Sequence, residues 1–306
     1  MGKIAFLFAG QGSQYTGMGK SLYENSDAAK KVFDLADEIR PNTSKQCFEG
    51  SSEELSITIN TQPCLFCVDL AAAEALREAG ITPDAVAGFS LGEVAALTFA
   101  GSFSHKDGFS LVCKRAELMH KASEQSKSGM VAIMKLTPDK VTEICGQFKD
   151  CYPINFNCPG QIVAATLRDR SDALLAAVKQ AGGRALPLPV SGGFHSPFMQ
   201  PAYEGLQKAL EEYTFAQPVV PVYANSTAAP YPTSNKQMLA EQLIRPVYWQ
   251  RTLENMFADG FDTFIEVGAG KTLSGFVKKT LPEARFANVQ DADSLAAALA
   301  MLKGEN

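Results

Sequence analysis

Histidine, tryptophan and long apolar segments are scarce in this chain of 306 residues, which has three histidines and one tryptophan. No apolar run approaches the ~20 residues that a helix needs to cross a bilayer, so we expect no membrane segment. The opening residues 1–8 are too few for a secretory signal and predict a buried strand. The formal net charge of −5 argues against nucleic-acid binding, which needs clustered lysine and arginine.

The cysteine content excludes further classes of protein. Seven cysteines, an odd number, are scattered through apolar segments, which favours a reducing cytoplasm over a disulfide framework. Cys64 and Cys67 have the spacing of a metal or redox pair, but the apolar sequence around them predicts a buried helix. Because no second pair and no nearby histidine complete a zinc site, we predict neither a metal nor a cofactor. We expect a cytoplasmic monomer.

Strand-like and helix-like segments alternate along most of the chain, which predicts an α/β fold with a mainly parallel, hydrolase-like sheet. The predicted strands of this body are residues 3–9, 85–89, 219–223, 261–267 and 285–289. Its predicted helices are residues 63–79, 91–100, 106–123, 201–213, 236–244, 247–258, 271–281 and 294–302. Thr61 or Gln62 would cap the first of these helices, and Gly80 would end it.

A different order of elements lies between residues 128 and 191. The predicted strands 130–136, 152–157, 161–167 and 184–190 and the predicted helices 138–148 and 171–181 follow the order βαββαβ, the ferredoxin-like arrangement. We therefore predict an α/β catalytic body of residues 1–127 and 192–306. Residues 128–191 would form an inserted ferredoxin-like subdomain, with a cleft between the two parts.

A serine stands between two glycines where a predicted strand becomes a predicted helix, in the run Gly88-Phe89-Ser90-Leu91-Gly92. A sharp strand-to-helix turn crowds the backbone around its middle residue, and flanking glycines relieve that crowding. Such a turn, called a nucleophile elbow, exposes the serine Oγ above the sheet. Small loops match this pattern by chance, but the strand before it and the helix after it favour a nucleophile at Ser90.

A serine hydroxyl becomes a good nucleophile when a base takes its proton, and histidine is the usual base. His120 lies in a helical pattern and His105 in a loop that leads into a helix, so surface or packing roles suit both. His195 follows the flexible run Ser191-Gly192-Gly193, where the chain re-enters the body at the predicted cleft. We therefore assign the base to His195. No Asp or Glu stands out as a triad member, so a dyad oriented by a backbone carbonyl is kept as an alternative.

The loop after the first strand, Gly10-Gln11-Gly12, lies where a doubly wound sheet forms its ligand crevice. It lacks the lysine of a P-loop and the third glycine of a dinucleotide fingerprint, which excludes both. The backbone amides of Gln11 and Leu91 can instead form an oxyanion hole. Arg115 lies in a helix with one apolar face, and is either a surface side chain or a buried guanidinium that pairs with a carboxylate.

Together these motifs resemble the malonyl-CoA:acyl carrier protein transacylases of fatty-acid synthesis and the acyltransferase domains of polyketide synthases. The resemblance covers nearly the whole chain and includes residues 10–14, 61–63, 88–93, 115, 155–161, 184–191, 195, 245–249 and 266–271. It implies that Ser90 is acylated, that His195 is the base, and that the Gln11 and Leu91 amides form the oxyanion hole.

The resemblance also implies roles for other residues around Ser90. Arg115 would pair with the malonyl carboxylate, and Gln62 would line the pocket. The backbone carbonyl of Gln242 would orient the base in place of an acid. Asn155 and Arg184 match positions that are associated with the thioester carrier.

Two aromatic residues bear on the acyl specificity that the resemblance implies. The family usually has histidine directly before the elbow serine, where this chain has Phe89, and this difference predicts a reshaped acyl pocket. That histidine is not the base, so the chemistry should be retained. Phe194, directly before His195, resembles the malonyl-type pattern of polyketide acyltransferases.

The predicted function is transfer of a malonyl group from malonyl-CoA to the phosphopantetheine thiol of an acyl carrier protein, in fatty-acid synthesis. An acyl-serine would be the intermediate. The expected partners are malonyl-CoA and the carrier protein, with no nucleic acid and no membrane. The alternatives are a stand-alone acyltransferase of a polyketide synthase, a plain α/β serine hydrolase and a non-catalytic carrier-binding module.

Overall fold

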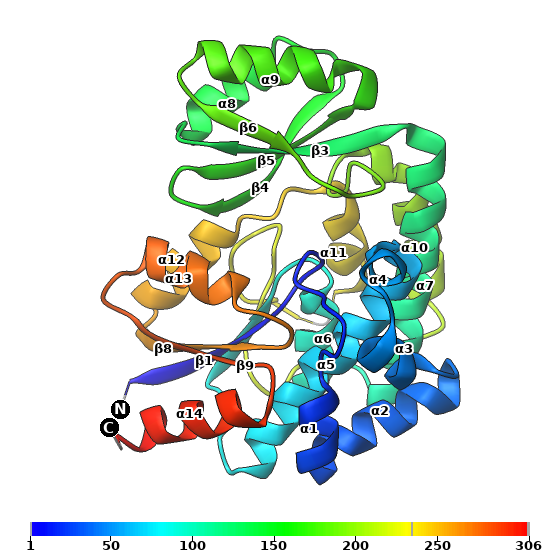
Figure 1. The fold of residues 1–306 in the computed structure, drawn as a ribbon, viewed down its shortest axis with the longest axis vertical. Coiled ribbons are helices and arrows are strands. Elements are labelled where there is room, and N and C mark those ends of the chain that lie inside the picture. The colour runs from blue at the N-terminus through cyan, green and yellow to red at the C-terminus, as the bar shows by residue number, and fades with distance from the viewer. Residues whose placement is uncertain (1, 234, 305–306) are drawn as a thin grey trace.

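The computed structural model describes residues 2–233 and 235–304. Within these residues it contains a five-stranded parallel sheet and a separate four-stranded antiparallel sheet (Figure 1). The parallel sheet has the order β7-β2-β1-β8-β9 and consists of β1 (Lys3–Phe8), β2 (Ala85–Gly88), β7 (Val222–Tyr223), β8 (Phe261–Val267) and β9 (Arg285–Val289). The predicted mixed α/β class is confirmed.

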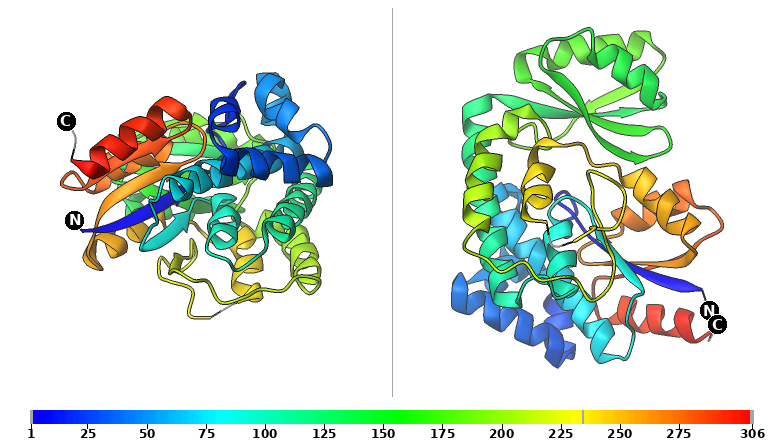
Figure 2. Two further views of the ribbon diagram at one scale, coloured as in Figure 1. Left: turned by 90° about the horizontal axis from the view of Figure 1, so that it is seen from below. Right: turned by 180° about the vertical axis from the view of Figure 1, so that it is seen from behind.

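Helices cover both faces of the parallel sheet (Figures 1 and 2). On one face lie α5 (Thr58–Glu78), α6 (Gly92–Phe99) and α7 (His105–Ser126), and on the other lie α12 (Trp249–Ala258) and α13 (Thr272–Thr280). Because side chains alternate along a strand, Phe6 and Phe8 of β1 join the first core, whereas Ala5 and Leu7 join the second. Burial of both faces explains the unbroken apolar sequence of β1.

The other helices of the body surround this sheet. They are α1 (Lys20–Asn25), α2 (Asp27–Ile39), α3 (Thr43–Glu49), α4 (Ser52–Ser56), α10 (Gln200–Leu210), α11 (Lys236–Glu241) and α14 (Ala292–Lys303), with the short 3₁₀ helices η2 (Pro197–Met199) and η3 (Gln242–Ile244). Across the described residues, every helix is too short or too polar to cross a membrane.

The antiparallel sheet has the order β4-β5-β3-β6 and forms one end of the molecule (Figure 1). It consists of β3 (Ser128–Met134), β4 (Cys151–Cys158), β5 (Gln161–Leu167) and β6 (Arg184–Pro187), with α8 (Pro138–Cys145), η1 (Arg168–Arg170) and α9 (Ser171–Gln180). It has a core of its own, in which Val131 and Ile133 pack against Val141 of α8 and Leu174 of α9. As Figure 2 shows from behind, α8 and α9 lie on the side away from the parallel sheet.

The antiparallel sheet is joined to the body through β4. The amide of Phe156 donates to the Val247 carbonyl at 2.9 Å, and the amide of Val247 donates to the Ile154 carbonyl at 2.7 Å. The helices α12 and α13 also pack against β4. These contacts place one end of β4 beside the carboxyl ends of the parallel strands.

Most predicted strands of the body are confirmed, but one is too long. The predicted strand 219–223 is only β7 (Val222–Tyr223), because Pro218 and Pro221 have no N–H for a ladder bond. Val219 is 80% exposed. Similarly, β6 ends at Pro187, before the predicted residue 190.

The start and the cap of one predicted helix are also corrected. The helix predicted to begin at Pro63 is α5, which begins at Thr58 and contains this proline, so the predicted cap at Thr61 or Gln62 is wrong. The proline removes only one backbone hydrogen bond, and the residues around it are buried in the core. Gly80, with φ of 84°, ends the helix as predicted.

The sequence analysis missed α1 to α4. For α2 a signal was present: Ser26 caps the helix by accepting from the amide of Ala29, and the buried residues Ala29, Val32, Phe33 and Ala36 recur at helical spacing.

Candidate active site

Ser90 lies on the turn that joins β2 to α6. Its backbone φ is 55°, in the left-handed region that residues other than glycine seldom adopt. The flanking glycines allow this turn, because a Cβ at Gly88 would lie 1.9 Å from the Gly92 carbonyl oxygen. A Cβ at Gly92 would lie 2.4 Å from the carbonyl oxygen of Phe8. At this elbow, the close approach that the glycines allow is therefore between two backbone segments.

His195 lies against Ser90. Its Nε2 is 2.7 Å from Ser90 Oγ, and its Nδ1 is 2.8 Å from the backbone carbonyl oxygen of Gln242. An Nδ1–H that donates to this carbonyl leaves Nε2 unprotonated and able to accept the hydroxyl proton. No carboxylate of the described chain binds the ring, so the arrangement is the dyad with a carbonyl in place of an acid.

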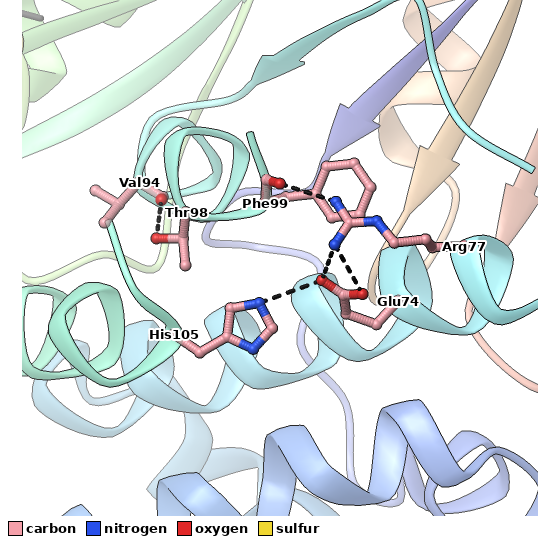
Figure 3. Close-up of polar contacts among 6 residues, drawn as sticks. All are labelled: Glu74, Arg77, Val94, Thr98, Phe99 and His105. Carbon is pink, nitrogen blue, oxygen red and sulfur yellow. Dashed lines mark hydrogen bonds and ion pairs between the residues drawn. The ribbon is translucent and has the colours of Figure 1, made fainter. Parts of the chain in front are cut away.

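The other two histidines are bound elsewhere. His105, the first residue of α7, lies with its Nε2 3.2 Å from an oxygen of Glu74, which also pairs with Arg77 at 2.8 Å (Figure 3). His120 pairs at 3.7 Å with a glutamate one turn further along the same helix. Neither ring contacts Ser90. Among the three histidines, only the geometry of His195 suits a base.

Burial keeps the His195 ring neutral. The residue is 3% exposed, and its pKa is lowered from 6.5 to about 4. Burial is the largest cause and the charge of Arg115 adds to it, whereas the hydrogen bond to the Gln242 carbonyl partly opposes the shift. A neutral imidazole is the form that can take a proton from serine.

Arg115 lies on α7 beside the nucleophile and is 1% exposed. Its Nη1 donates to Gln62 Oε1 at 2.7 Å, and its Nη2 lies 2.9 Å from Gln242 Oε1 and 3.3 Å from Ser90 Oγ. Burial lowers its pKa to about 10, which leaves the guanidinium charged at neutral pH. Its Nε has no hydrogen-bond partner among the described residues. Arg115 is therefore a buried guanidinium, and the alternative interpretation as a surface side chain is wrong.

Gln242, the first residue of η3, connects these three groups. Its backbone carbonyl accepts from His195, its Oε1 accepts from Arg115, and its Nε2 donates to the carbonyl of Ser90 at 2.8 Å. The sequence analysis considered only the backbone carbonyl. The side chain has a role of its own, because it hydrogen-bonds both the guanidinium of Arg115 and the backbone of the elbow.

The amides of Gln11 and Leu91 are available to a ligand. Both residues line the cavity around Ser90, and neither amide donates a hydrogen bond to another described residue. The amide of Ser90 itself is taken, because it donates to Asn225 Oδ1 at 2.7 Å. Two free donors beside a nucleophile can stabilise an oxyanion.

The cavity around Ser90 has a volume of about 360 Å³ and lies between the body and the antiparallel sheet. Of the residues predicted for the site, those that line it are Gln11, Gln62, Ser90, Leu91, Arg115, Asn155, Phe194 and His195. Gln242 lies behind this lining. Arg184 is not among the lining residues and is exposed at the start of β6.

Two asparagines of β4 face this cavity. Asn155 and Asn157 are both buried and line the cavity, and in both the side-chain Oδ1 has no hydrogen-bond partner among the described residues. Asn157 was missed in the sequence, although alternate residues of a strand face the same side. An unpaired buried carbonyl oxygen is suited to accept an N–H from a ligand.

Phe89 also forms part of the cavity wall. Its ring contacts Trp249 edge-on, with the ring centroids 5.3 Å apart, and also lies near Phe276. The ring is thereby held in an aromatic group of α12 and α13. The two hydrogen bonds of the His195 ring are to Ser90 and Gln242, so the dyad forms without the side chain at position 89.

Comparison with known proteins identifies the family. The acyl transferase domain model matches residues 5–303. The malonyl CoA-acyl carrier protein transacylase of Bacillus subtilis (strain 168) is 43% identical over 317 aligned residues, which cover 100% of this chain and 99% of the relative. The chain belongs to the malonyl CoA-acyl carrier protein transacylase family.

Solved structures of transacylases have the same fold. The transacylase of Clostridium perfringens is 36% identical, with a TM-score of 0.95, and the match covers 99% of this chain and 98% of that one. A malonyl-transacylase in complex with the acyl carrier protein of a type II polyketide synthase is 33% identical, with a TM-score of 0.93 and coverage of 97% and 99%. Both sheets described above therefore belong to the transacylase fold.

We predict that the acid limb of the pH profile of the transacylase rate lies near pH 4 rather than near pH 6.5. Because the pKa of His195 is lowered from 6.5 to about 4, the ring stays neutral at pH 6.5 and loses its function as a base as the pH falls through about 4. The rate of acyl-enzyme formation at malonyl-CoA concentrations below KM, followed by rapid-quench mass spectrometry, should show this acid limb, with circular dichroism to check the fold at each pH. An acid limb at pH 6.5 would contradict the shift.

We predict opposite effects for two glycine-to-alanine changes. Gly88→Ala should lower the free energy of unfolding by more than about 2 kcal/mol, because its Cβ would meet the Gly92 carbonyl oxygen. Gly275→Ala on α13 is the matched control, since nothing lies within 4 Å of its Cβ and alanine favours a helix by about 1 kcal/mol. Urea unfolding measures both. Equal stability of the two variants would contradict the close approach at Gly88.

Proposed function

We propose that this chain transfers a malonyl group from malonyl-CoA to the phosphopantetheine thiol of an acyl carrier protein. The observation that carries the proposal is the charged, buried guanidinium of Arg115 at 3.3 Å from Ser90 Oγ. A buried cation beside a nucleophile suits an acyl group that ends in a carboxylate, and its planar fork can form two hydrogen bonds to it. The names of the relatives support the same activity.

In the first half-reaction Ser90 Oγ attacks the thioester carbonyl carbon of malonyl-CoA, and His195 Nε2 takes the hydroxyl proton. The carbonyl oxygen becomes an oxyanion, which the amides of Gln11 and Leu91 stabilise. When the tetrahedral intermediate collapses, the C–S bond breaks and the leaving thiolate takes the proton from His195. The products are malonyl-Ser90 and CoA.

The second half-reaction runs through the same groups in reverse. The carrier thiol gives its proton to His195 and attacks the acyl-serine carbonyl. The C–O bond breaks, and Ser90 recovers the proton from the ring. Water competes with the thiol at this step, and Arg115 favours the thiol because it holds the acyl group in one orientation.

The phosphopantetheine arm is common to CoA and the carrier protein, and it contains amide N–H groups. Asn155 and Asn157 have unpaired side-chain oxygens in the cavity wall, and these can accept hydrogen bonds from the arm. Arg184, exposed at the start of β6, is placed for contact with the carrier protein itself. We propose no cofactor and no metal for the reaction.

We also propose a division of the chain into a subdomain and a body. The order β4-β5-β3-β6 with two helices on one face supports a ferredoxin-like subdomain of residues 128–191. Residues 1–127 and 192–306 then form a hydrolase-like body, in which the elbow serine lies at the carboxyl end of a parallel strand. The monomeric state and the cytoplasmic compartment remain predictions.

We assign the chain first to fatty-acid synthesis. The second candidate is a role with a polyketide synthase, which is favoured by the related transacylase in complex with the acyl carrier protein of a type II polyketide synthase. The chemistry at Ser90 is the same in both. Kinetics with carrier proteins of the two classes distinguish them.

We predict that incubation with malonyl-CoA adds one malonyl mass to the Ser90 peptide, and that Ser90→Ala abolishes this adduct without unfolding the protein. His195→Ala should slow adduct formation by at least ~10²-fold, because a general base contributes about that much. His120→Ala is the matched control and should leave the rate unchanged. Intact mass spectrometry measures the adduct, and mass spectrometry of a protein digest locates it on the Ser90 peptide.

Two outcomes would contradict this assignment. A normal adduct yield in Ser90→Ala would place the nucleophile elsewhere. Rapid release of free malonate from the wild-type protein without a carrier would indicate a hydrolase.

We predict that Arg115→Ala lowers malonyl transfer at least about 10-fold more than acetyl transfer, because only malonyl has a carboxylate for the guanidinium. Arg77→Ala is a control, since Arg77 binds Glu74 away from the site (Figure 3). This change should affect both acyl groups equally. Transfer rates from malonyl-CoA and acetyl-CoA to one carrier protein measure the ratio, and an unchanged ratio in Arg115→Ala would make its role structural.

A further inference from the structure

Asn225 lies behind the nucleophile elbow and is 0% exposed. It follows β7 (Val222–Tyr223), the strand next to β2 in the sheet. Its side-chain Oδ1 accepts from the amide of Ser90 at 2.7 Å, and its Nδ2 donates to the carbonyl of Gly88 at 2.6 Å. One side chain therefore binds the backbone on both sides of Phe89.

The backbone of Asn225 is held as firmly as its side chain. Its amide donates to Glu93 Oε2 at 2.7 Å, and its carbonyl accepts from the amide of Tyr248 at 2.9 Å. Glu93 is buried in the first turn of α6 and also accepts from the hydroxyl of Tyr231. Asn225 is thus anchored to the helix that begins just after the elbow.

These contacts act on a backbone that is not in a relaxed conformation. Ser90 has a φ of 55°, and such a conformation persists in a non-glycine residue only where its surroundings determine it. The two side-chain bonds of Asn225 fix the peptide groups that enter the turn. They also occupy the Ser90 amide, which leaves the next amide, that of Leu91, for the substrate.

We propose that Asn225 is a positioning residue for acyl transfer, whose side-chain amide holds the elbow so that Ser90 Oγ stays against His195. The inference rests on the proposed role of Ser90 as the nucleophile. Asn225 is not among the residues that line the cavity and forms no hydrogen bond to His195, so it would act through the backbone of Ser90. Its loss should therefore slow the chemical step more than it weakens substrate binding.

The first test compares Asn225→Ala with a matched control, Asn255→Ala. Asn255 also uses its side chain to hold a backbone carbonyl, that of Ala228 at 2.8 Å, but it does not touch the elbow. We expect Asn225→Ala to lower kcat about 10- to 100-fold with KM changed less than about twofold. The control should keep the wild-type kcat. A wild-type kcat in a folded Asn225→Ala variant would overturn the proposal.

A second variant distinguishes positioning of the elbow from a general contribution to folding. In Asn225→Asp, a protonated carboxyl can still accept from Ser90 and donate to Gly88, whereas the ionised form cannot donate. Four other titratable groups lie in the hydrogen-bond network around position 225. Glu93 and Tyr231 connect to its backbone amide, and His195 and Arg115 both contact Ser90 Oγ. Burial beside Glu93 should raise the pKa of the new carboxyl above its ordinary range, so that it is protonated at the acid end, where His195, with its pKa lowered to about 4, is still neutral.

We therefore expect Asn225→Asp to be more active than Asn225→Ala at low pH, and to lose that advantage as the pH rises. Activity of both variants is expressed relative to the wild type at each pH from about 5 to about 9. Rescue at the acid end supports the proposal. Absence of rescue at every pH would overturn it.

A fluorophosphonate probe separates failure of this inference from failure of the proposed function. The probe reacts with an activated serine whatever its natural substrate is, so its rate reports the position of Ser90 Oγ. We expect Asn225→Ala to slow labelling by the same factor as malonyl transfer. If the probe labels the wild-type protein but malonyl-CoA does not acylate it, the proposed function is refuted. The ratio of the labelling rates of the wild type and Asn225→Ala would still test the role of Asn225.

Discussion

Ser90 can meet its base and its oxyanion donors together only because its backbone is held at a φ of 55°. This left-handed turn needs Gly88 and Gly92, whose missing side chains let two backbone segments approach each other. It also needs two hydrogen bonds to side chains outside the turn: the Ser90 amide donates to Asn225 Oδ1, and Gln242 Nε2 donates to the Ser90 carbonyl. The rest of the site is arranged around a conformation that the local chain would not adopt by itself.

Electrostatics in the buried site link the acyl group to the base. The charge of Arg115 helps to lower the pKa of His195, and burial of both groups makes the effect stronger. In the proposed binding mode, a malonyl carboxylate on the guanidinium would offset the charge of Arg115. The imidazole would then accept a proton more readily, and a substrate with a carboxylate would strengthen the base that acts on it.

The site also depends on how the two sheets meet. Asn155 and Asn157 reach the cavity from the antiparallel sheet, whereas the dyad belongs to the body. Arg168 ties together the two connections between these parts, because its Nε donates to the Ser128 carbonyl at 2.9 Å and its Nη2 to the Ser191 carbonyl at 2.8 Å. One side chain therefore holds the two connections together.

Local patterns in the sequence determined the elbow at Ser90, the parallel strands and most helices, because glycine spacing and apolar periodicity act over a few residues. The helices between residues 20 and 56 were missed although Ser26 and its buried partners carried such a pattern. Only the tertiary structure decided what holds the elbow. Asn225 and Gln242 lie 135 and 152 residues from Ser90 along the chain, and they meet it because β7 pairs with β2 and η3 packs beside the turn. Contacts of this kind follow from the packing of distant segments, which no local periodicity records.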